Sequence, residues 1–181
     1  MEVRTARFCF RALRPSDQRP WIAAMEASVA LHQPWFPLPL AGQSLADRFA
    51  AQLGAHVAGT SFKGVAVTDD HRIAAWANLN DIVRGASFTA NAGWAVAADF
   101  AGQGVMTEAV TALLDLAFAP QGLGLHRVAC GIMPENHRSL RVAEKCGFRR
   151  EGFAPELIHI AGQWRDHVLL AKLAREHTPP G

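Results

Sequence analysis

The most consequential absence in this chain of 181 residues is tyrosine, which does not occur in it. Any mechanism that uses a tyrosine hydroxyl as its acid or base is therefore excluded. Cysteine is also scarce, and Cys9, Cys130 and Cys146 show neither a paired nor a metal-like spacing. This pattern argues against a disulfide framework and favours a reduced, cytoplasmic location.

Strong net charge and long apolar runs are missing too. A formal net charge of +2 is too small to indicate a nucleic-acid partner. No apolar run approaches the roughly 20 residues of a membrane span, and the N-terminus lacks the basic-then-apolar layout of a signal peptide. The eight histidines form no HExxH or other ligand spacing, so we predict no metal site. We expect neither a nucleic-acid nor a membrane partner, and a monomer or homodimer.

What the chain does contain is typical of one globular domain, which we place over residues 1–181. Its residues are 50% hydrophobic and 19% charged. Apolar patterns predict strands at 3–13, at 61–80 (a hairpin turning at Asp69–Asp70), at 93–98, at 126–133, and three closing strands at 148–154, 156–162 and 164–173. Helices are predicted after a cap at Ser16 or Asp17, after Ser44, over 105–119, and from Asn136 to Gly147. The three prolines within 32–40 predict a loop.

The stretch "DFAGQGVMTEAVTALL", residues 99–114, places a glycine-rich turn directly before a helix. Gly102 and Gly104 give the backbone conformational freedom and bring no side chain to keep a ligand away. The first N–H groups of a helix are unpaired and attract anions. A plain glycine turn between a strand and a helix is the competing interpretation. Thr107 stands where a dinucleotide fingerprint needs its third glycine, and no Gly-Lys-Ser/Thr ending of a Walker loop is present.

Together with "GLHRVACGIMPENHRSLRVAEKCGFRREG" downstream, this stretch resembles the GNAT acetyltransferases. The segments "LHQPWFP", "NDIVRGASF" and "AGQWRDHVLLA" are similar to the ribosomal-protein N-terminal acetyltransferases of the RimJ/RimL kind. The resemblance implies an α/β (α+β) GNAT fold: a mixed, mostly antiparallel twisted sheet of about seven strands, flanked by about four helices. It also implies acetyl-CoA as co-substrate.

The resemblance assigns the pantetheine arm of acetyl-CoA to Val96 and its neighbours. It assigns the pyrophosphate to the backbone N–H groups of Ala101, Gly102, Gln103, Gly104, Val105, Met106 and Thr107. Many members have Gln or Arg in place of Ala101, so we expect the backbone to contribute more of the binding here. Asn136, by residue type a helix cap, also corresponds to a residue that binds the cofactor arm.

Ser139 matches a position near the cofactor sulfur and is our candidate catalytic residue. With no tyrosine available, we expect its hydroxyl to stabilise the departing thiolate by a hydrogen bond. The general base stays unassigned: Ile158 occupies the position where some relatives have Glu, and Glu156 and His159 are only neighbours of it. A protein α-amino group, with a pKa near 8, is in part neutral without any base.

Three residues in the subfamily-like stretches, Trp35, Arg84 and Trp164, are our candidates for the acceptor groove. The same residue types also occur as core, rim or solvated surface residues. The acceptor expected first is a protein N-terminus, such as that of a ribosomal protein. Two alternatives remain: an acetyltransferase for a small amine (a polyamine, an amino acid or an antibiotic), and a GNAT module that binds acyl-CoA without turnover.

Overall fold

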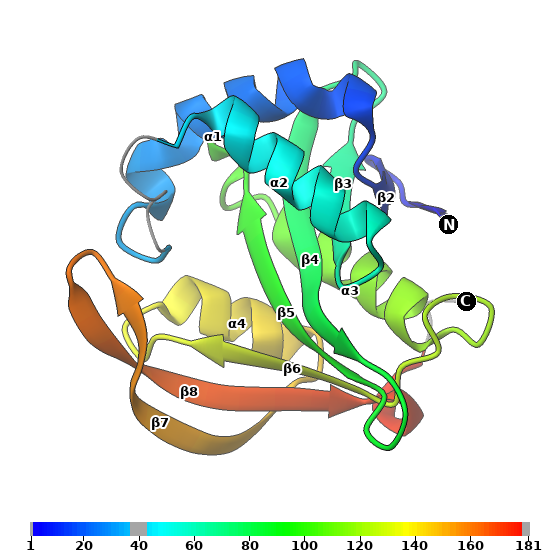
Figure 1. Ribbon diagram of the computed structural model, residues 1–181, viewed down its shortest axis with the longest axis vertical. Helices are drawn as coiled ribbons and strands as arrows, with labels where there is room; N and C mark the ends of the chain where they lie inside the picture. Colours follow the sequence, from blue (N-terminus) through cyan, green and yellow to red (C-terminus); the bar gives the residue numbers. More distant parts are fainter. Residues whose placement is uncertain (1, 37–42, 179–181) are drawn as a thin grey trace.

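The computed structural model describes residues 2–36 and 43–178, and over these it contains one eight-stranded sheet and four α-helices (Figure 1). The strands are β1 (Glu2–Arg4), β2 (Cys9–Ala12), β3 (Phe62–Val67), β4 (Ile73–Val83), β5 (Thr89–Val96), β6 (Arg127–Ile132), β7 (Arg149–Ile160) and β8 (Gln163–Leu173). The helices are α1 (Gln18–His32), α2 (Leu45–Val57), α3 (Val105–Phe118) and α4 (His137–Lys145). Short 3-10 turns occupy Pro15–Asp17, Ala98–Phe100 and Ala174–Glu176.

The strand order is β1-β2-β3-β4-β5-β6-β8-β7, and all pairings are antiparallel except that of β5 with β6. The predicted fold class is therefore confirmed, with eight strands instead of about seven. The 61–80 hairpin and the four predicted helices are also confirmed. Part of the predicted loop at 32–40 lies outside the described residues.

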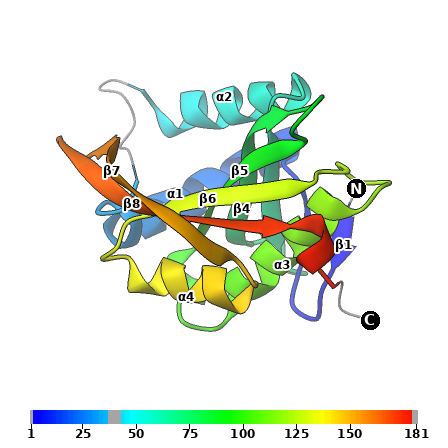
Figure 2. The ribbon, with the colours of Figure 1, turned by 90° about the horizontal axis from the view of Figure 1, so that it is seen from below.

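Helices cover both faces of the sheet (Figure 2). Helices α1 and α2 pack over β3 and β4 through Trp21, whose ring lies edge-on to Phe49 at 5.7 Å and near Trp76 at 6.4 Å. Helix α3 lies on the opposite face, where its predicted stripe of Val105, Ala109, Leu113 and Ala117 is fully buried. This larger core fixes where α3 begins, and that position matters for the site.

Three local predictions need correction. The predicted strand at 3–13 is a hairpin of β1 and β2, because the chain turns where Thr5 N–H donates to Phe8 O (2.9 Å). The strands predicted at 148–154 and 156–162 form the single strand β7, whose register shifts between Ala154 and Ile158. Pro155, which cannot donate a ladder hydrogen bond, is accommodated in that irregularity.

The third correction concerns the start of α1. Asp17 precedes the helix as predicted, but its side chain does not cap α1. The carboxylate accepts instead from Arg14 N–H (2.8 Å) and from the Arg11 guanidinium (2.7 and 2.8 Å). The predicted caps of α2 and α4 are confirmed. Ser44 accepts from Asp47 N–H (3.1 Å), and Asn136 accepts from Ser139 N–H (3.1 Å).

Two searches of the described part of the chain gave negative results. None of its helices is long and apolar enough to cross a membrane. No group of three or more His, Cys, Asp or Glu side chains among residues 2–36 and 43–178 is placed to hold a metal ion.

Candidate active site

The central feature of the candidate site is a gap between β5 and β6. These parallel strands pair only from Thr89–Arg127 to Asn91–Ala129, and then diverge (Figure 1). Ala97 N–H donates to Ala74 O on β4 (2.9 Å), so the backbone groups of Val96, one residue earlier, point to the other edge of β5. The end of β5 therefore presents the Val96 N–H group to the gap, where an extended ligand can pair with it, while Val96 O lies 2.8 Å from His32 Nε2.

The predicted glycine loop follows this strand end. Gly102 (φ 77°) and Gly104 (φ 79°) both have left-handed backbone conformations, which residues with side chains rarely adopt. A Cβ atom at Gly102 would meet nothing within 4 Å, and one at Gly104 would meet only the Arg7 guanidinium at 3.8 Å. The space in front of the loop is therefore open, and glycine keeps it so.

Helix α3 begins at Val105 without a side-chain cap. Its first intrahelical bond is donated by Glu108 N–H to Gly104 O, so the N–H groups of Val105, Met106 and Thr107 face the loop. The Val105 and Met106 side chains are buried in the core. The N–H groups of Val105 and Met106 are therefore presented without their side chains, which suits an anion such as a diphosphate.

A cation that sequence reasoning missed reaches this loop. Arg7, from the β1–β2 turn, donates from Nη1 to Gln103 O (2.7 Å) and from Nε to Glu108 (2.7 Å). Its guanidinium is ion-paired there with the Glu108 carboxylate, and the remaining Nη1 contact holds the loop backbone. No sequence signal identified it, because Arg7 lies 101 residues before its ion-pair partner.

The second helix start lies at the same end of the gap. Parallel strands end at the same edge of a sheet, so β6 leads to α4 beside the point where β5 leads to α3. Ser139, in the first turn of α4, is half-buried, and its hydroxyl makes no hydrogen bond to any residue that the structure describes. Asn136 has the cap role that its residue type indicated, through Oδ1.

The side chain of Trp94, on β5, packs against the core. Its ring packs near Phe148 with a centroid distance of 5.9 Å. The indole N–H is buried, and it has no hydrogen-bond partner in the described residues. Four other buried side-chain atoms in the described residues also lack a partner, so this donor does not by itself identify a ligand.

The three predicted acceptor residues are not all brought together. Trp164, 61% exposed, lies next to the β7–β8 turn with its ring edge-on to His159 at 5.4 Å. Trp35 is half-buried directly after α1. The end of α1 and the β7–β8 turn lie at the left of both Figure 1 and Figure 2.

Arg84 is elsewhere. It belongs to the β4–β5 turn, at the lower right of Figure 1, and donates to Leu123 O (2.9 Å). The expectation that Arg84 lies near the two tryptophans is wrong, because the long strands β4 and β5 carry it to the opposite end of the sheet.

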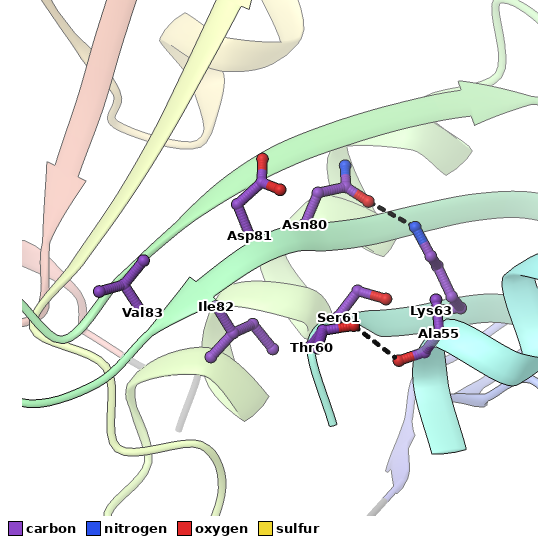
Figure 3. Close-up of a pocket in the computed structure, with 8 residues that line it drawn as sticks. All are labelled: Ala55, Thr60, Ser61, Lys63, Asn80, Asp81, Ile82 and Val83. Carbon is purple, nitrogen blue, oxygen red and sulfur yellow. Dashed lines mark hydrogen bonds between the residues drawn. The ribbon is translucent and has the colours of Figure 1, made fainter. Parts of the chain in front are cut away.

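A cavity also lies at that distal end (Figure 3). It measures about 400 Å³ and is lined by Ala55, Thr60, Ser61, Lys63, Asn80, Asp81, Ile82 and Val83. Burial lowers the pKa of Lys63, which donates to Asn80, while the Asp81 carboxylate raises it in part. Val83 pairs with Thr89, at the other end of β5 from Val96 and roughly 23 Å from it. This cavity is therefore not part of the gap.

The chain is similar in sequence to several known proteins. The family model for the acetyltransferase (GNAT) domain matches residues 7–149. Probable N-acetyltransferase YjcK of Bacillus subtilis (strain 168) is 43% identical over 110 residues, which are 61% of this chain and 60% of that protein. The [ribosomal protein uS5]-alanine N-acetyltransferase of Escherichia coli (strain K12) is 32% identical over 152 residues, 81% of this chain and 77% of that enzyme.

Solved structures show the same fold. The ribosomal-protein-S5-alanine acetyltransferase from Vibrio fischeri superposes with a TM-score of 0.87 at 24% identity, over 99% of this chain and 100% of the other. Mycobacterium smegmatis RimJ, in complex with CoA-disulfide, gives 0.83 at 27% identity, over 93% and 82%. Spermidine N-acetyltransferase from Vibrio cholerae, in complex with CoA and spermine, gives 0.81 at 21%, over 96% and 99%. The family model and the Escherichia coli relative together show that this chain belongs to the GNAT family of N-acetyltransferases.

Proposed function

We propose that this protein transfers the acetyl group of acetyl-CoA to a primary amine, and that this amine is the N-terminal α-amino group of a protein, a ribosomal protein first of all. The observation that carries the proposal is the gap between β5 and β6, which opens onto a left-handed glycine loop and an uncapped helix. The 32% identity to an enzyme that acetylates an N-terminal alanine of a ribosomal protein supports this acceptor class.

The residues that would hold acetyl-CoA are mostly backbone groups. The free edge of β5 at Val96 suits the amide groups of the pantetheine arm, and the N–H groups at Gly102–Thr107 suit the diphosphate. Arg7 adds a positive charge beside the same loop. When bound, acetyl-CoA supplies a thioester, whose carbonyl carbon accepts a nucleophile.

Ser139 is the hydroxyl that we assign to the leaving group. Ser139 lies in the first turn of α4, which follows the end of β6, and this position supports the assignment. As a hydrogen-bond donor it would stabilise the thiolate while the C–S bond breaks, with no need for an unusually acidic serine. This role accounts for turnover in a chain that has no tyrosine.

The acceptor class rests on the side of the molecule that holds the end of α1 and the β7–β8 turn (Figures 1 and 2). Trp164 is exposed there, and an exposed tryptophan provides a surface on which an extended peptide can pack. A free small amine would occupy the gap without reaching this surface. Contacts along a peptide would raise kcat/KM above what its amine alone supplies.

The test is release of free thiol from acetyl-CoA with a panel of acceptors: an alanine-initiated ribosomal peptide, the same peptide with a blocked N-terminus, free alanine and spermidine. We expect kcat/KM for the free peptide to exceed that for alanine by about ten- to a hundredfold, the value of one or two contacts of about 1.4 kcal/mol. The blocked peptide should give none. Equal or better rates with a free amine would assign the protein to small amines. Tight acetyl-CoA binding without release would indicate a non-catalytic module.

A further inference from the structure

His32, which the sequence did not identify as a candidate, lies at the gap between β5 and β6. His32, the last residue of α1, places its Nε2 atom 2.8 Å from Val96 O. That carbonyl is on the free edge of β5, because Ala97 N–H is the group that bonds to β4. His32 therefore contacts the strand end along which the thioester-bearing arm is proposed to lie.

The position of this imidazole is fixed by its surroundings. The ring is edge-on to Trp76 at 5.7 Å and to Phe36 at 5.5 Å. One turn earlier on the same helix face, the Ser28 hydroxyl accepts from Ala98 N–H (3.0 Å). Two side chains of α1 thus attach the helix to the backbone at the end of β5, and one of them is titratable.

The hydrogen bond also determines which ring nitrogen is basic. A carbonyl can only accept, so Nε2 carries the proton and the lone pair of the neutral ring is on Nδ1. Nδ1 makes no hydrogen bond to any residue within 2–36 and 43–178. Burial lowers the pKa of His32 below its ordinary value of 6.5, and the bond to Val96 raises it by less. The groups packed against the ring, Trp76, Phe36 and the Val96 carbonyl, carry no charge.

The other candidates for a base are less well placed. Glu156 and His159 are exposed on β7, and the Glu156 N–H is bound to Asp166 in the strand irregularity (2.8 Å). Glu108 is paired with Arg7, and Glu151 with Arg127. None of these four residues hydrogen-bonds to the end of β5 as His32 does.

We infer that His32 is the general base of the reaction, an assignment that rests on the proposed acetyl transfer. Nδ1 takes a proton from the acceptor ammonium, and the neutral amine nitrogen then bonds to the thioester carbonyl carbon. The C–S bond breaks, the nitrogen loses its second proton to solvent, and the thiolate is protonated. The products are the acetylated amine, the free thiol of CoA and one net proton, so atoms and charge balance.

The decisive variant is His32→Gln, because a glutamine amide can still donate to Val96 O but has no basic nitrogen. We expect kcat/KM with the alanine peptide to fall about 100-fold at pH 7, within the usual range for a general base. The loss should shrink to about tenfold at pH 9, where the N-terminal amine, with a pKa near 8, is already neutral. Ser28→Ala is the matched control. It removes the neighbouring bond of α1 and should raise KM for acetyl-CoA without changing the pH profile.

A second measurement does not depend on activity. NMR of imidazole-labelled protein without substrate should show the Nε2–H tautomer of His32 and a pKa below 6.5, and Ser28→Ala should preserve both. A purely structural His32 predicts that His32→Gln keeps the wild-type kcat and pH profile, and that result, or an Nδ1–H tautomer, overturns the inference. If the wild-type protein releases no thiol with any acceptor, it is the proposed function that fails.

Discussion

The substitution Gly104→Val tests whether the glycine loop binds phosphate or is an ordinary turn. Gly104 has φ 79°, and a Cβ atom there would approach only Arg7 Nη2 at 3.8 Å. The substitution therefore creates no clash inside the protein. Its folding cost is that of a left-handed conformation, about 1–2 kcal/mol and somewhat more for a β-branched residue.

The expected cost to ligand binding is larger than the cost to folding. The valine side chain would enter the open space before the N–H groups of Val105, Met106 and Thr107. Loss of one or two charge-assisted bonds to a diphosphate is worth about 3 kcal/mol in total, or about a 100-fold rise in Kd. Calorimetric titration with acetyl-CoA measures this directly, and thermal unfolding measures the folding cost in the same samples.

Gly59→Val is the matched control. Gly59 has φ 73° with nothing within 4 Å of an added Cβ, and it follows α2, away from the gap. Gly59→Val should lower Tm about as much as Gly104→Val and leave the Kd for acetyl-CoA unchanged. If the two variants lower Tm alike and both keep the wild-type Kd, the loop does not bind the diphosphate, and the reasoning from backbone geometry is refuted.

Four further outcomes follow from the structure. Ser139→Ala should lower kcat about 5- to 100-fold with little change in acetyl-CoA affinity, as expected for one hydrogen bond formed in the transition state. An unchanged rate of the chemical step would show that Ser139 does not stabilise the thiolate. Trp164→Ala should lower kcat/KM for the peptide several-fold and spare free alanine; equal losses would contradict the peptide surface. Arg7→Met should weaken acetyl-CoA binding more at low than at high salt, and a salt-independent loss would indicate a purely structural residue. Burial raises the pKa of Cys130 to about 12, so iodoacetamide at pH 8 should modify the half-buried Cys9 while Cys130 stays unmodified.

Sequence reasoning succeeded where the determining interactions are local. The Ser44 and Asn136 caps involve residues three positions away, and the turn at Gly104 needs a positive φ that glycine adopts without strain. The buried stripe of α3 is a periodicity within one helix. Each of these depends on a short window, so the residues alone indicate it.

The failures concern contacts across the sheet. His32 reaches Val96 over 64 positions, and Ser28 reaches Ala98 over 70. Neither residue type is unusual at the end of a helix, so only the packing of α1 against β4 shows their role. The predicted position of Arg84 was wrong for a related reason: the similarity of a sequence stretch to a subfamily does not show at which end of a long strand that stretch lies. At β1–β2, the apolar alternation continued across a turn, so two strands were predicted as one. At β7, Pro155 was taken as the end of a strand, so one strand was predicted as two.

The proposed site consists mainly of backbone groups, so its geometry does not depend on a tyrosine side chain. The proposed acetyl-CoA contacts at Val96 and at the start of α3 are backbone groups, whose positions are set by a buried core and by two left-handed glycines. Side-chain changes outside the core, such as at the half-buried Ala101, leave those groups in place. A charge absent from one position can also arrive from another segment, as Arg7 does from the β1–β2 turn. The few chemical tasks that need a side chain then fall on residues attached to this framework, Ser139 through the Asn136 cap and His32 through Val96. The proposal therefore divides the two tasks: it assigns acetyl-CoA binding to this backbone framework and acceptor selection to the surface beside Trp164.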